Sequence, residues 1–264
     1  MSDNPTGRRD RGEENQPGRP SPGKGIFVTG TDTDVGKTVA AAALLVLLRS
    51  AGVDAVPMKP VQTGGIRRVD AGCGERWTSS DLDFCLQMAG LEVGAEEYRA
   101  MAPYIYEPAC SPHLAADKSC LAISFRVIAD AFASLLKHHE CVVVEGAGGV
   151  LVPVGQDRSM LDLMVHLGLP VVLAARPSLG TLNHSLLSIR ELRRAGLTVL
   201  GVVFCETQAT QWGEIENDNR RTIERLGDTR ILGRIPYMPA LADGTLTPEA
   251  FRSTGTKEVH LPGI

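Results

Sequence analysis

The residues with the clearest chemical potential lie in the segment GTDTDVGKT at residues 30–38. A glycine-rich turn that follows a strand and opens a helix presents backbone amides and the positive helix end to phosphate oxygens. In such a turn Lys37 reaches the β and γ phosphates of a nucleotide, and Thr38 can ligate magnesium. The common pattern GxxxxGKS/T has glycine where this chain has Thr31, so the match is off by one residue. The segment predicts a phosphate loop; the alternative is a turn before an ordinary helix.

Two further segments place charged residues at predicted strand ends. The run CVVVEGAGG at residues 141–149 has the pattern of a buried strand that leads into Glu145 and then into glycines. A carboxylate at a strand tip beside a phosphate loop can hold magnesium directly or through water, whereas Glu145 taken singly also fits a capping or surface acid. Lys59, in KPVQTGG at residues 59–65, either brings a second positive charge to the γ phosphate or an anionic substrate, or is a solvated lysine at a strand exit.

The elements that must position these residues follow a regular alternation from residue 25 onward. Short β-branched runs predict strands, and near-continuous apolar runs indicate strands covered on both faces, as in a parallel sheet. Longer helical patterns separate them. The alternation predicts an α/β fold: a doubly wound, mostly parallel sheet with helices on both faces and with ligands at the carboxyl ends of the strands. Together with the predicted phosphate loop, this indicates the P-loop NTPase type. The expected strands are residues 26–29, 55–59, 141–144, 171–175, 199–204 and, more weakly, 231–235; the expected helices are residues 37–51, 124–137, 160–167, 181–195 and 214–226.

The rest of the chain divides simply. Residues 1–24 are rich in glycine, proline and charged residues and are expected to form a disordered tail, and residues 25–264 are expected to form one domain. The Gly-, Ser- and Arg-containing insertion at residues 66–80 is expected to be a mobile loop, either a lid or a tolerated surface loop.

Composition excludes several classes of protein. With 43% hydrophobic and 22% charged residues the chain is globular, and its net charge of -4 argues against broad binding to nucleic acid. The longest aliphatic run, residues 39–48, is too short to cross a membrane, and no secretory signal is present. The six cysteines show no metal-type spacing and are expected to be reduced thiols, as in a cytoplasmic protein.

Five motifs together resemble the dethiobiotin synthetase family. They are GTDTDVGKT at residues 30–38, KPVQTG at 59–64, SPH at 111–113, VEGAGG at 144–149 and GTLNH at 180–184. The resemblance covers residues 25–239. It implies that the chain converts 7,8-diaminononanoate (7,8-diaminopelargonate), carbon dioxide and ATP, with magnesium, into dethiobiotin, ADP and phosphate, through a carbamate and a carbamic-phosphoric anhydride.

The resemblance also implies roles for individual residues. Lys37 and Lys59 would be catalytic, and magnesium would be held by Thr38, Asp81 and Glu145. Apart from the resemblance, Asp81 would be interpreted as a helix N-cap, because an amphipathic stretch follows it. The nucleotide would contact Asp34, Val35, Gly36, Lys37, Thr38, Val39, Asp81, Glu145, Gly146, Ala147, Gly148, Cys205, Glu206, Pro236 and Tyr237.

The substrate site implied by the resemblance has two parts. Thr33 and Thr63 would contact the substrate with their hydroxyl groups. The helix start at Gly180, Thr181, Leu182 and Asn183 would receive the substrate carboxylate from the neighbouring subunit, since its free amides attract anions. A homodimer with shared active sites is thus implied. His113 and His184 lie in family motifs, but a lone histidine is more often packed or solvated than catalytic.

One position departs from the family. Members commonly carry asparagine after the fifth strand, where the amide reads the adenine edge, and this chain has Cys205. A thiol cannot present the paired donor and acceptor of an amide. The hypothesis is that base selectivity is relaxed or comes from backbone near Pro236 and Tyr237; the alternative is that Cys205 is a small buried hydrophobe.

Two other functions stay open. An amide-forming synthetase resembling the cobyrinate diamide synthases would need a glutaminase domain, for which too few residues follow Cys205. A partitioning-type ATPase acting as a nucleotide-gated switch typically has a second lysine inside the phosphate loop, and no lysine precedes Lys37 in this loop.

Overall fold

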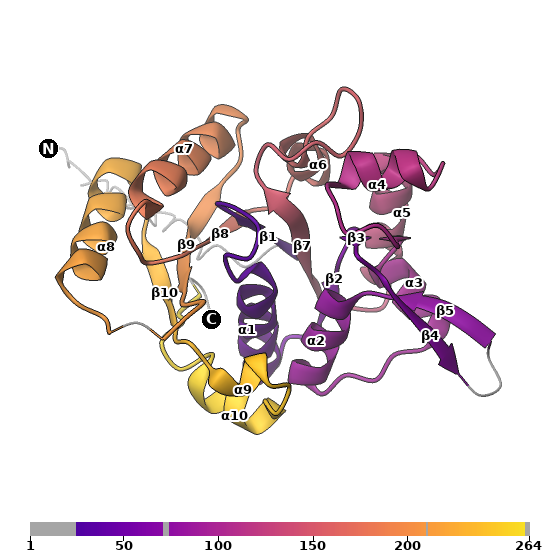
Figure 1. The fold of residues 1–264 in the computed structure, drawn as a ribbon, viewed down its shortest axis with the longest axis horizontal. Coiled ribbons are helices and arrows are strands. Elements are labelled where there is room, and N and C mark those ends of the chain that lie inside the picture. Colours follow the sequence, from indigo (N-terminus) through magenta and orange to yellow (C-terminus); the bar gives the residue numbers. More distant parts are fainter. Residues whose placement is uncertain (1–24, 71–73, 210, 262–264) are drawn as a thin grey trace, which may run out of the picture.

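A six-stranded parallel sheet forms the centre of the molecule (Figure 1). The computed structural model describes residues 25–70, 74–209 and 211–261, so the predicted tail lies outside the described residues. The strand order is β10-β9-β8-β1-β7-β2, and every neighbouring pair is parallel. The doubly wound α/β fold predicted from the sequence is confirmed. The strands are β1 (Gly25–Gly30), β2 (Ala55–Met58), β7 (Cys141–Gly149), β8 (Val171–Ala175), β9 (Val199–Cys205) and β10 (Ile231–Ile235).

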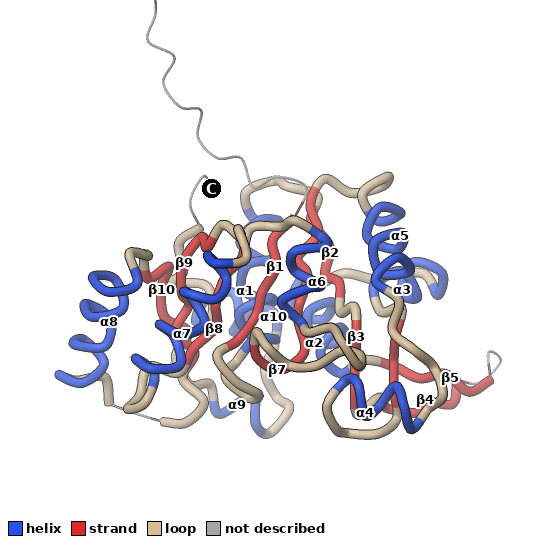
Figure 2. Tube along the Cα trace, turned by 90° about the horizontal axis from the view of Figure 1, so that it is seen from above, coloured by secondary structure: helices blue, strands red, loops and turns tan. Residues whose placement is uncertain are grey.

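Helices cover both faces of this sheet (Figure 2). One face packs against α1 (Lys37–Ser50), α2 (Ser80–Ala89) and α10 (Pro248–Thr254). The other face packs against α5 (Phe125–Leu135), α6 (Met160–Leu167), α7 (Thr181–Arg194) and α8 (Glu214–Gly227). Three shorter helices complete the set within the described ranges: α3 (Ala95–Met101), α4 (Pro112–Lys118) and α9 (Pro239–Ala242).

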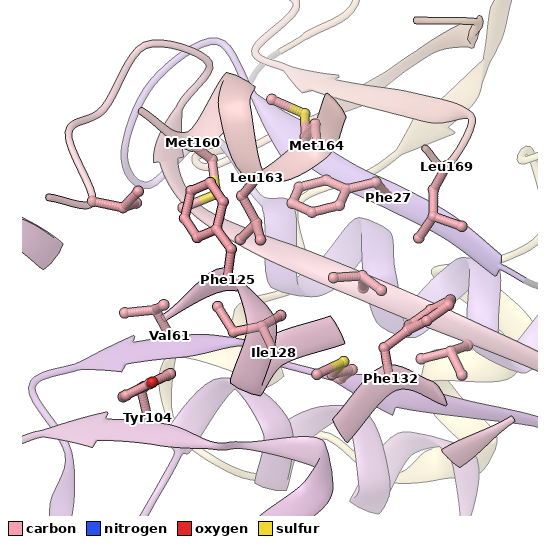
Figure 3. Close-up of a cluster of buried hydrophobic side chains, with 14 of the residues drawn as sticks. Phe27, Val61, Tyr104, Phe125, Ile128, Phe132, Met160, Leu163, Met164 and Leu169 are labelled. Carbon is pink, nitrogen blue, oxygen red and sulfur yellow. The ribbon is translucent and has the colours of Figure 1, made fainter. Parts of the chain in front are cut away.

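The alternation of side chains along β1 explains why both faces are covered. Ile26 and Val28 belong to the core on the α1 side, whereas Phe27 belongs to the core that includes α5 and α6. Figure 3 shows Phe27 beside Leu163 and Met164 of α6. All three β1 residues are fully buried, so β1 can carry the phosphate loop on a rigid base.

Strand β7 is longer than predicted. It was expected to end at residue 144, but it continues through Gly149, because Val28 of β1 pairs with Glu145 and Gly30 pairs with Gly149 across an irregular step. Glu145 therefore lies within a strand rather than just after one, so strand residues hold the backbone both before and after it.

The insertion at residues 66–80 was predicted to be a loop, and this is wrong. It forms an antiparallel hairpin of β4 (Ile66–Asp70) and β5 (Gly74–Thr78), which extends away from the main sheet in Figure 1. Its paired positions carry arginine, valine, tryptophan and threonine, and the β-branched and aromatic members favour extended backbone. A separate parallel pair, β3 (Val61–Thr63) with β6 (Tyr104–Tyr106), links the hairpin to the main sheet.

No helix in the described ranges combines the length and the apolar character needed to cross a membrane.

Candidate active site

The phosphate loop runs from the end of β1 to the start of α1. Its last residue before the helix, Gly36, has φ of +91°, in the left-handed region that favours glycine. A Cβ atom at Gly36 would lie 2.4 Å from Cβ of Cys205, so the loop and the end of β9 are packed too closely for a side chain there. Lys37 Nζ donates to the Asp32 carbonyl oxygen at 2.7 Å. The Lys37 side chain therefore folds back onto the phosphate loop.

A pocket of about 510 Å³ opens beside this loop at the carboxyl ends of the strands. Most residues predicted to contact the nucleotide or substrate line it: Thr33, Asp34, Gly36, Lys37, Thr38, Val39, Lys59, Thr63, Asp81, Glu145, Ala147, Gly148, Cys205, Glu206, Pro236 and Tyr237. Two predicted members lie just outside. Val35 is buried behind the loop, and Gly146 contributes its carbonyl oxygen to Lys59 at 3.1 Å.

The centre of the pocket is a cluster of three buried or half-buried charges. Lys59 Nζ lies 2.7 Å from Asp81 Oδ2 and 2.7 Å from Glu145 Oε1. Glu145 Oε1 also accepts the Thr38 hydroxyl at 2.8 Å. Lys59 and Glu145 are only 4% and 3% exposed, so water contributes little to their solvation and each depends on the other. The structure therefore brings together a lysine, two carboxylates and the loop threonine, which lie far apart in the sequence.

The pKa values of the groups in this cluster depend on burial and on how far their charges compensate one another. Burial alone would lower the pKa of Lys59, but the two carboxylates more than offset it and hold the pKa above its usual range. For Asp81, burial raises the pKa, but Lys59 outweighs it and the net direction is downward. For Glu145, burial dominates and raises the pKa, despite Lys59. With Lys59 in place, the pKa is thus raised for Glu145 and lowered for Asp81.

Lys37 responds differently because no carboxylate touches it. Burial and the positive charge of Lys59 lower its pKa, and the more distant acids only partly restore it. The positive charge of Lys37 would therefore be stabilised by a phosphate group bound beside it.

The interpretation of Asp81 as a helix N-cap is wrong. Ser79 caps α2, and its Oγ accepts the Leu82 N–H at 3.1 Å. Asp81 lies in the first turn, where its side chain is free to reach Lys59. The sequence offered two serines directly before Asp81, and either could have been read as the cap.

The donor set fits magnesium. Thr38, Asp81 and Glu145 supply hard oxygen ligands around Lys59, and magnesium usually takes one or two carboxylates, keeping water and phosphate oxygens for its other positions. In the described part of the chain no group of three or more His, Cys, Asp or Glu side chains could hold a metal ion by itself.

At the end of β9, the Cys205 side chain packs against the phosphate loop. This side chain is 2% exposed, Sγ donates to the Gly36 carbonyl oxygen at 3.5 Å, and burial raises the pKa of the thiol to about 12. Next to it, Glu206 forms an ion pair with Arg234 at 2.8 Å and accepts the Tyr237 N–H at 3.3 Å. The Cys205 thiol and the Glu206 carboxylate therefore already have partners, so they offer few free polar atoms to a molecule bound in this part of the pocket.

The predicted carboxylate site lies elsewhere on this chain. Gly180 and Thr181 line a small separate pocket of about 90 Å³ behind the phosphate loop, with Arg176, and Leu182 and Asn183 follow in the first turn of α7. Gly180 provides the N-cap without a side-chain hydrogen bond. The structure thus brings Thr33 and Thr63 to the main pocket but not the α7 start, as a site shared between subunits would require.

Several lining residues were not predicted. They come from β3, from the segment just after β9, from the last residue of β10, from the residue that leads into α9 and from α9 itself, although Gln62 stood inside the KPVQTG motif. These residues are Val61, Gln62, Thr207, Ile235, Met238, Leu241 and Ala242.

The fold and the pocket define a P-loop nucleotide-binding protein of the α/β class. The structure of the septum site-determining protein MinD with Mg-ADP from Pyrococcus horikoshii aligns with a TM-score of 0.54 at 15% identity, over 89% of this chain and 92% of that one, and shows the fold alone. A family model described as an AAA domain matches residues 24–245.

Curated relatives narrow the class. The ATP-dependent dethiobiotin synthetase BioD of Halalkalibacterium halodurans is 37% identical over 234 residues, which cover 87% of this chain and 93% of the relative. The enzyme of the same name from Anaeromyxobacter dehalogenans is 38% identical over 219 residues, covering 83% and 92%. This chain belongs to the dethiobiotin synthetase family.

Proposed function

We propose that this protein is an ATP- and magnesium-dependent dethiobiotin synthetase of biotin biosynthesis. It would convert 7,8-diaminononanoate and carbon dioxide into dethiobiotin, with ATP giving ADP and phosphate. The observation that carries the proposal is Lys59, held at 2.7 Å by both Asp81 and Glu145 in the pocket that the phosphate loop lines. Family membership supports the same conclusion.

The proposed chemistry proceeds in three balanced steps. One substrate amine adds to carbon dioxide and releases a proton, which gives a carbamate. A carbamate oxygen attacks the γ phosphorus and ADP leaves with the electron pair of the broken bond, which gives a carbamic-phosphoric anhydride. The second amine attacks the carbonyl carbon of the anhydride, phosphate leaves, and the amine proton passes to solvent as the ring closes.

The protein contributes position and charge to these steps. Lys37 would move from the Asp32 carbonyl oxygen to the β and γ phosphates and follow the transferred group. Lys59, which stays protonated between its two carboxylates, would neutralise the carbamate and the charge that develops on the γ phosphate. The hydroxyls of Thr33 and Thr63 line the same pocket and would orient the diamine.

Magnesium would be held by Thr38, Asp81 and Glu145, and it supplies positive charge to the phosphate oxygens when bound. The Mg-ADP complex of the MinD structure supports this choice of metal. A bound metal would supply positive charge beside the two carboxylates that Lys59 contacts.

We further propose a homodimer with shared active sites. The start of α7, residues 180–183, would accept the substrate carboxylate from the partner subunit's pocket, because its backbone amides have no side-chain cap. The residue set at the other end of the pocket supports relaxed base selectivity. Cys205 is turned toward Gly36 and the Tyr237 N–H is donated to Glu206, so the backbone carbonyl oxygens near Pro236 and Tyr237 would contact the base.

One assay tests the activity. Purified protein is incubated with diaminononanoate, bicarbonate and MgATP, and dethiobiotin is measured by mass together with released phosphate. Equal amounts of both products are expected, with none when the diamine is left out. The proposal fails if folded, magnesium-loaded protein releases no phosphate in response to the diamine.

A further inference from the structure

A buried chain of hydrogen bonds joins the strand that carries Thr63 to the helix that carries Asp81. Gln62 Nε2 donates to the Thr63 carbonyl oxygen at 2.7 Å. Gln62 Oε1 accepts the Ser79 hydroxyl at 2.6 Å, and Ser79 Oγ in turn accepts the Leu82 N–H at 3.1 Å. The path runs from the exit of β3, through two side chains, into the first turn of α2.

The burial of this path makes each bond count. Ser79 is fully buried and Gln62 is 6% exposed, so neither side chain has ready access to water as an alternative partner. A buried amide or hydroxyl left without a partner costs about 1–3 kcal/mol. Ser79 Oγ donates to one neighbour and accepts from another, and both ends of the Gln62 amide are used. The pair can therefore hold only a narrow range of relative positions of β3 and α2.

A second anchor fixes the same helix turn from α3. The Tyr98 hydroxyl accepts the Ser79 N–H at 2.9 Å and donates to Asp83 Oδ1 at 2.6 Å. Burial raises the pKa of Tyr98, so the hydroxyl stays protonated and remains a donor. Asp81 lies between these anchored residues, and its own carboxylate reaches Lys59.

A helix cap alone does not explain the arrangement. Capping requires only the Ser79 oxygen and the Leu82 amide, and an exposed serine would serve. Gln62 adds nothing to the cap, yet both of its polar ends are committed to the link between Thr63 and Ser79.

We propose that Gln62 and Ser79 are positioning residues that set the place of Asp81 relative to Thr63. The inference rests on the proposed function, in which Thr63 contacts the diamine and Asp81 holds magnesium. Through this pair, the substrate end of the pocket and the metal end keep a fixed separation. Neither residue needs to touch the reacting atoms.

The test compares Gln62→Met with Ser79→Gly. Gln62→Met keeps the length of the side chain and removes both hydrogen bonds. Ser79→Gly removes the hydroxyl but keeps a residue that serves well at an N-cap, at a cost of a few tenths of a kcal/mol to the helix. Calorimetric titration of magnesium into the ADP-bound protein is the main readout, since it needs neither the diamine nor turnover.

Each variant is expected to weaken magnesium binding by ~10 to 100-fold, as loss of a group that orients a metal ligand commonly does. The double variant is expected to lose no more magnesium affinity than the single variant with the larger loss, because both changes break the same path. The matched control is Thr247→Ala, which removes the side-chain cap of α10 and should leave magnesium affinity unchanged.

The inference is overturned if either variant, folded by circular dichroism, binds magnesium as the parent does, or if the two losses add. Should Gln62→Met fail to fold, Ser79→Gly alone decides the test, because it breaks the same Gln62–Ser79 hydrogen bond from the other side. The diamine assay on the unchanged protein decides the proposed function separately, so the two failures are distinguishable.

Discussion

Replacement of Lys59 by glutamine is the perturbation whose size the structure defines best. The change removes the one cation that contacts both buried carboxylates at 2.7 Å. Each contact corresponds to about 6 kcal/mol of Coulomb attraction at an effective dielectric constant of about 20. Desolvation of the charges offsets most of this, and removing one partner of a buried pair costs about 3–5 kcal/mol.

Three measurements test this prediction. The melting temperature should fall by about 6–20 °C, since 1 kcal/mol shifts Tm by about 2–4 °C in a domain of 150–250 residues. The turnover number should fall by ~100 to 1000-fold, as on loss of a preorganised charge that stabilises a transition state. Nucleotide binding, measured by calorimetry, should persist, because the phosphate loop and Lys37 are intact. Lys137→Gln, an exposed lysine after α5, is the matched control.

The loss of stability in Lys59→Gln should depend on pH in a defined direction. Burial already raises the pKa of Glu145, and without Lys59 nothing comparable lowers it. Below about pH 4, near the pKa of an unfolded glutamate, both states are protonated and the penalty is smallest. The penalty grows as pH rises, until the raised pKa of Glu145 has been passed. The reasoning is refuted if the variant loses nucleotide binding yet keeps single-turnover chemistry, or if Tm does not change at pH 7.

Three further predictions use other parts of the site and fold. Gly36→Ala should lower the free energy of unfolding in urea by about 2–5 kcal/mol, because the alanine would be strained in the left-handed region and would overlap Cys205. The matched control is Gly52→Ala, which has a similar φ but open space around it and should cost about 1–2 kcal/mol. Equal losses in the two variants would contradict the close packing of Gly36 against Cys205. The kcat/KM values for ATP, CTP and GTP should be of the same order, and a strong ATP preference that disappears in Cys205→Ala would sink the interpretation of the base site. Burial raises the pKa of Asp54, but the hydrogen bond and charge of His139 help to outweigh it, so the net direction is downward. Asp54→Asn should therefore destabilise the protein above about pH 4 and lose this effect as pH falls through the lowered pKa, and a loss that is constant from pH 3 to pH 7 would argue against it.

The main sheet could be predicted from the sequence because its strands are buried on both faces. Runs such as CVVV at residues 141–144 are short and β-branched, which favours a strand covered on both faces, and the bounds of the five predicted helices agree within about two residues. The hairpin at β4 and β5 could not be predicted in this way. Its strands are mostly exposed and carry arginine, so pairing with each other, rather than burial, defines them.

The sequence predicted those site residues that lie in recognisable motifs. The loop, Lys59 and Glu145 each stood at the end of a predicted strand, and parallel strands bring such ends to one edge. Asp81 was different, because its place depends on Ser79 and on contacts with β3 and α3 that leave no periodic signal in the sequence. The same reason explains why Gln62 was overlooked: a side chain that only orients another residue has no pattern of its own.

The packing of Cys205 has a consequence for the discovery of inhibitors. A cysteine that lines a nucleotide pocket is an obvious target for electrophilic compounds, which react with the thiolate. Here the sulfur is buried against Gly36, and burial raises the pKa of the thiol to about 12, so almost no thiolate forms at neutral pH. Compounds directed at this pocket would therefore have to bind through reversible contacts rather than through Cys205. If an electrophilic compound labels the protein, the exposed Cys120 is the first residue to examine for the modification.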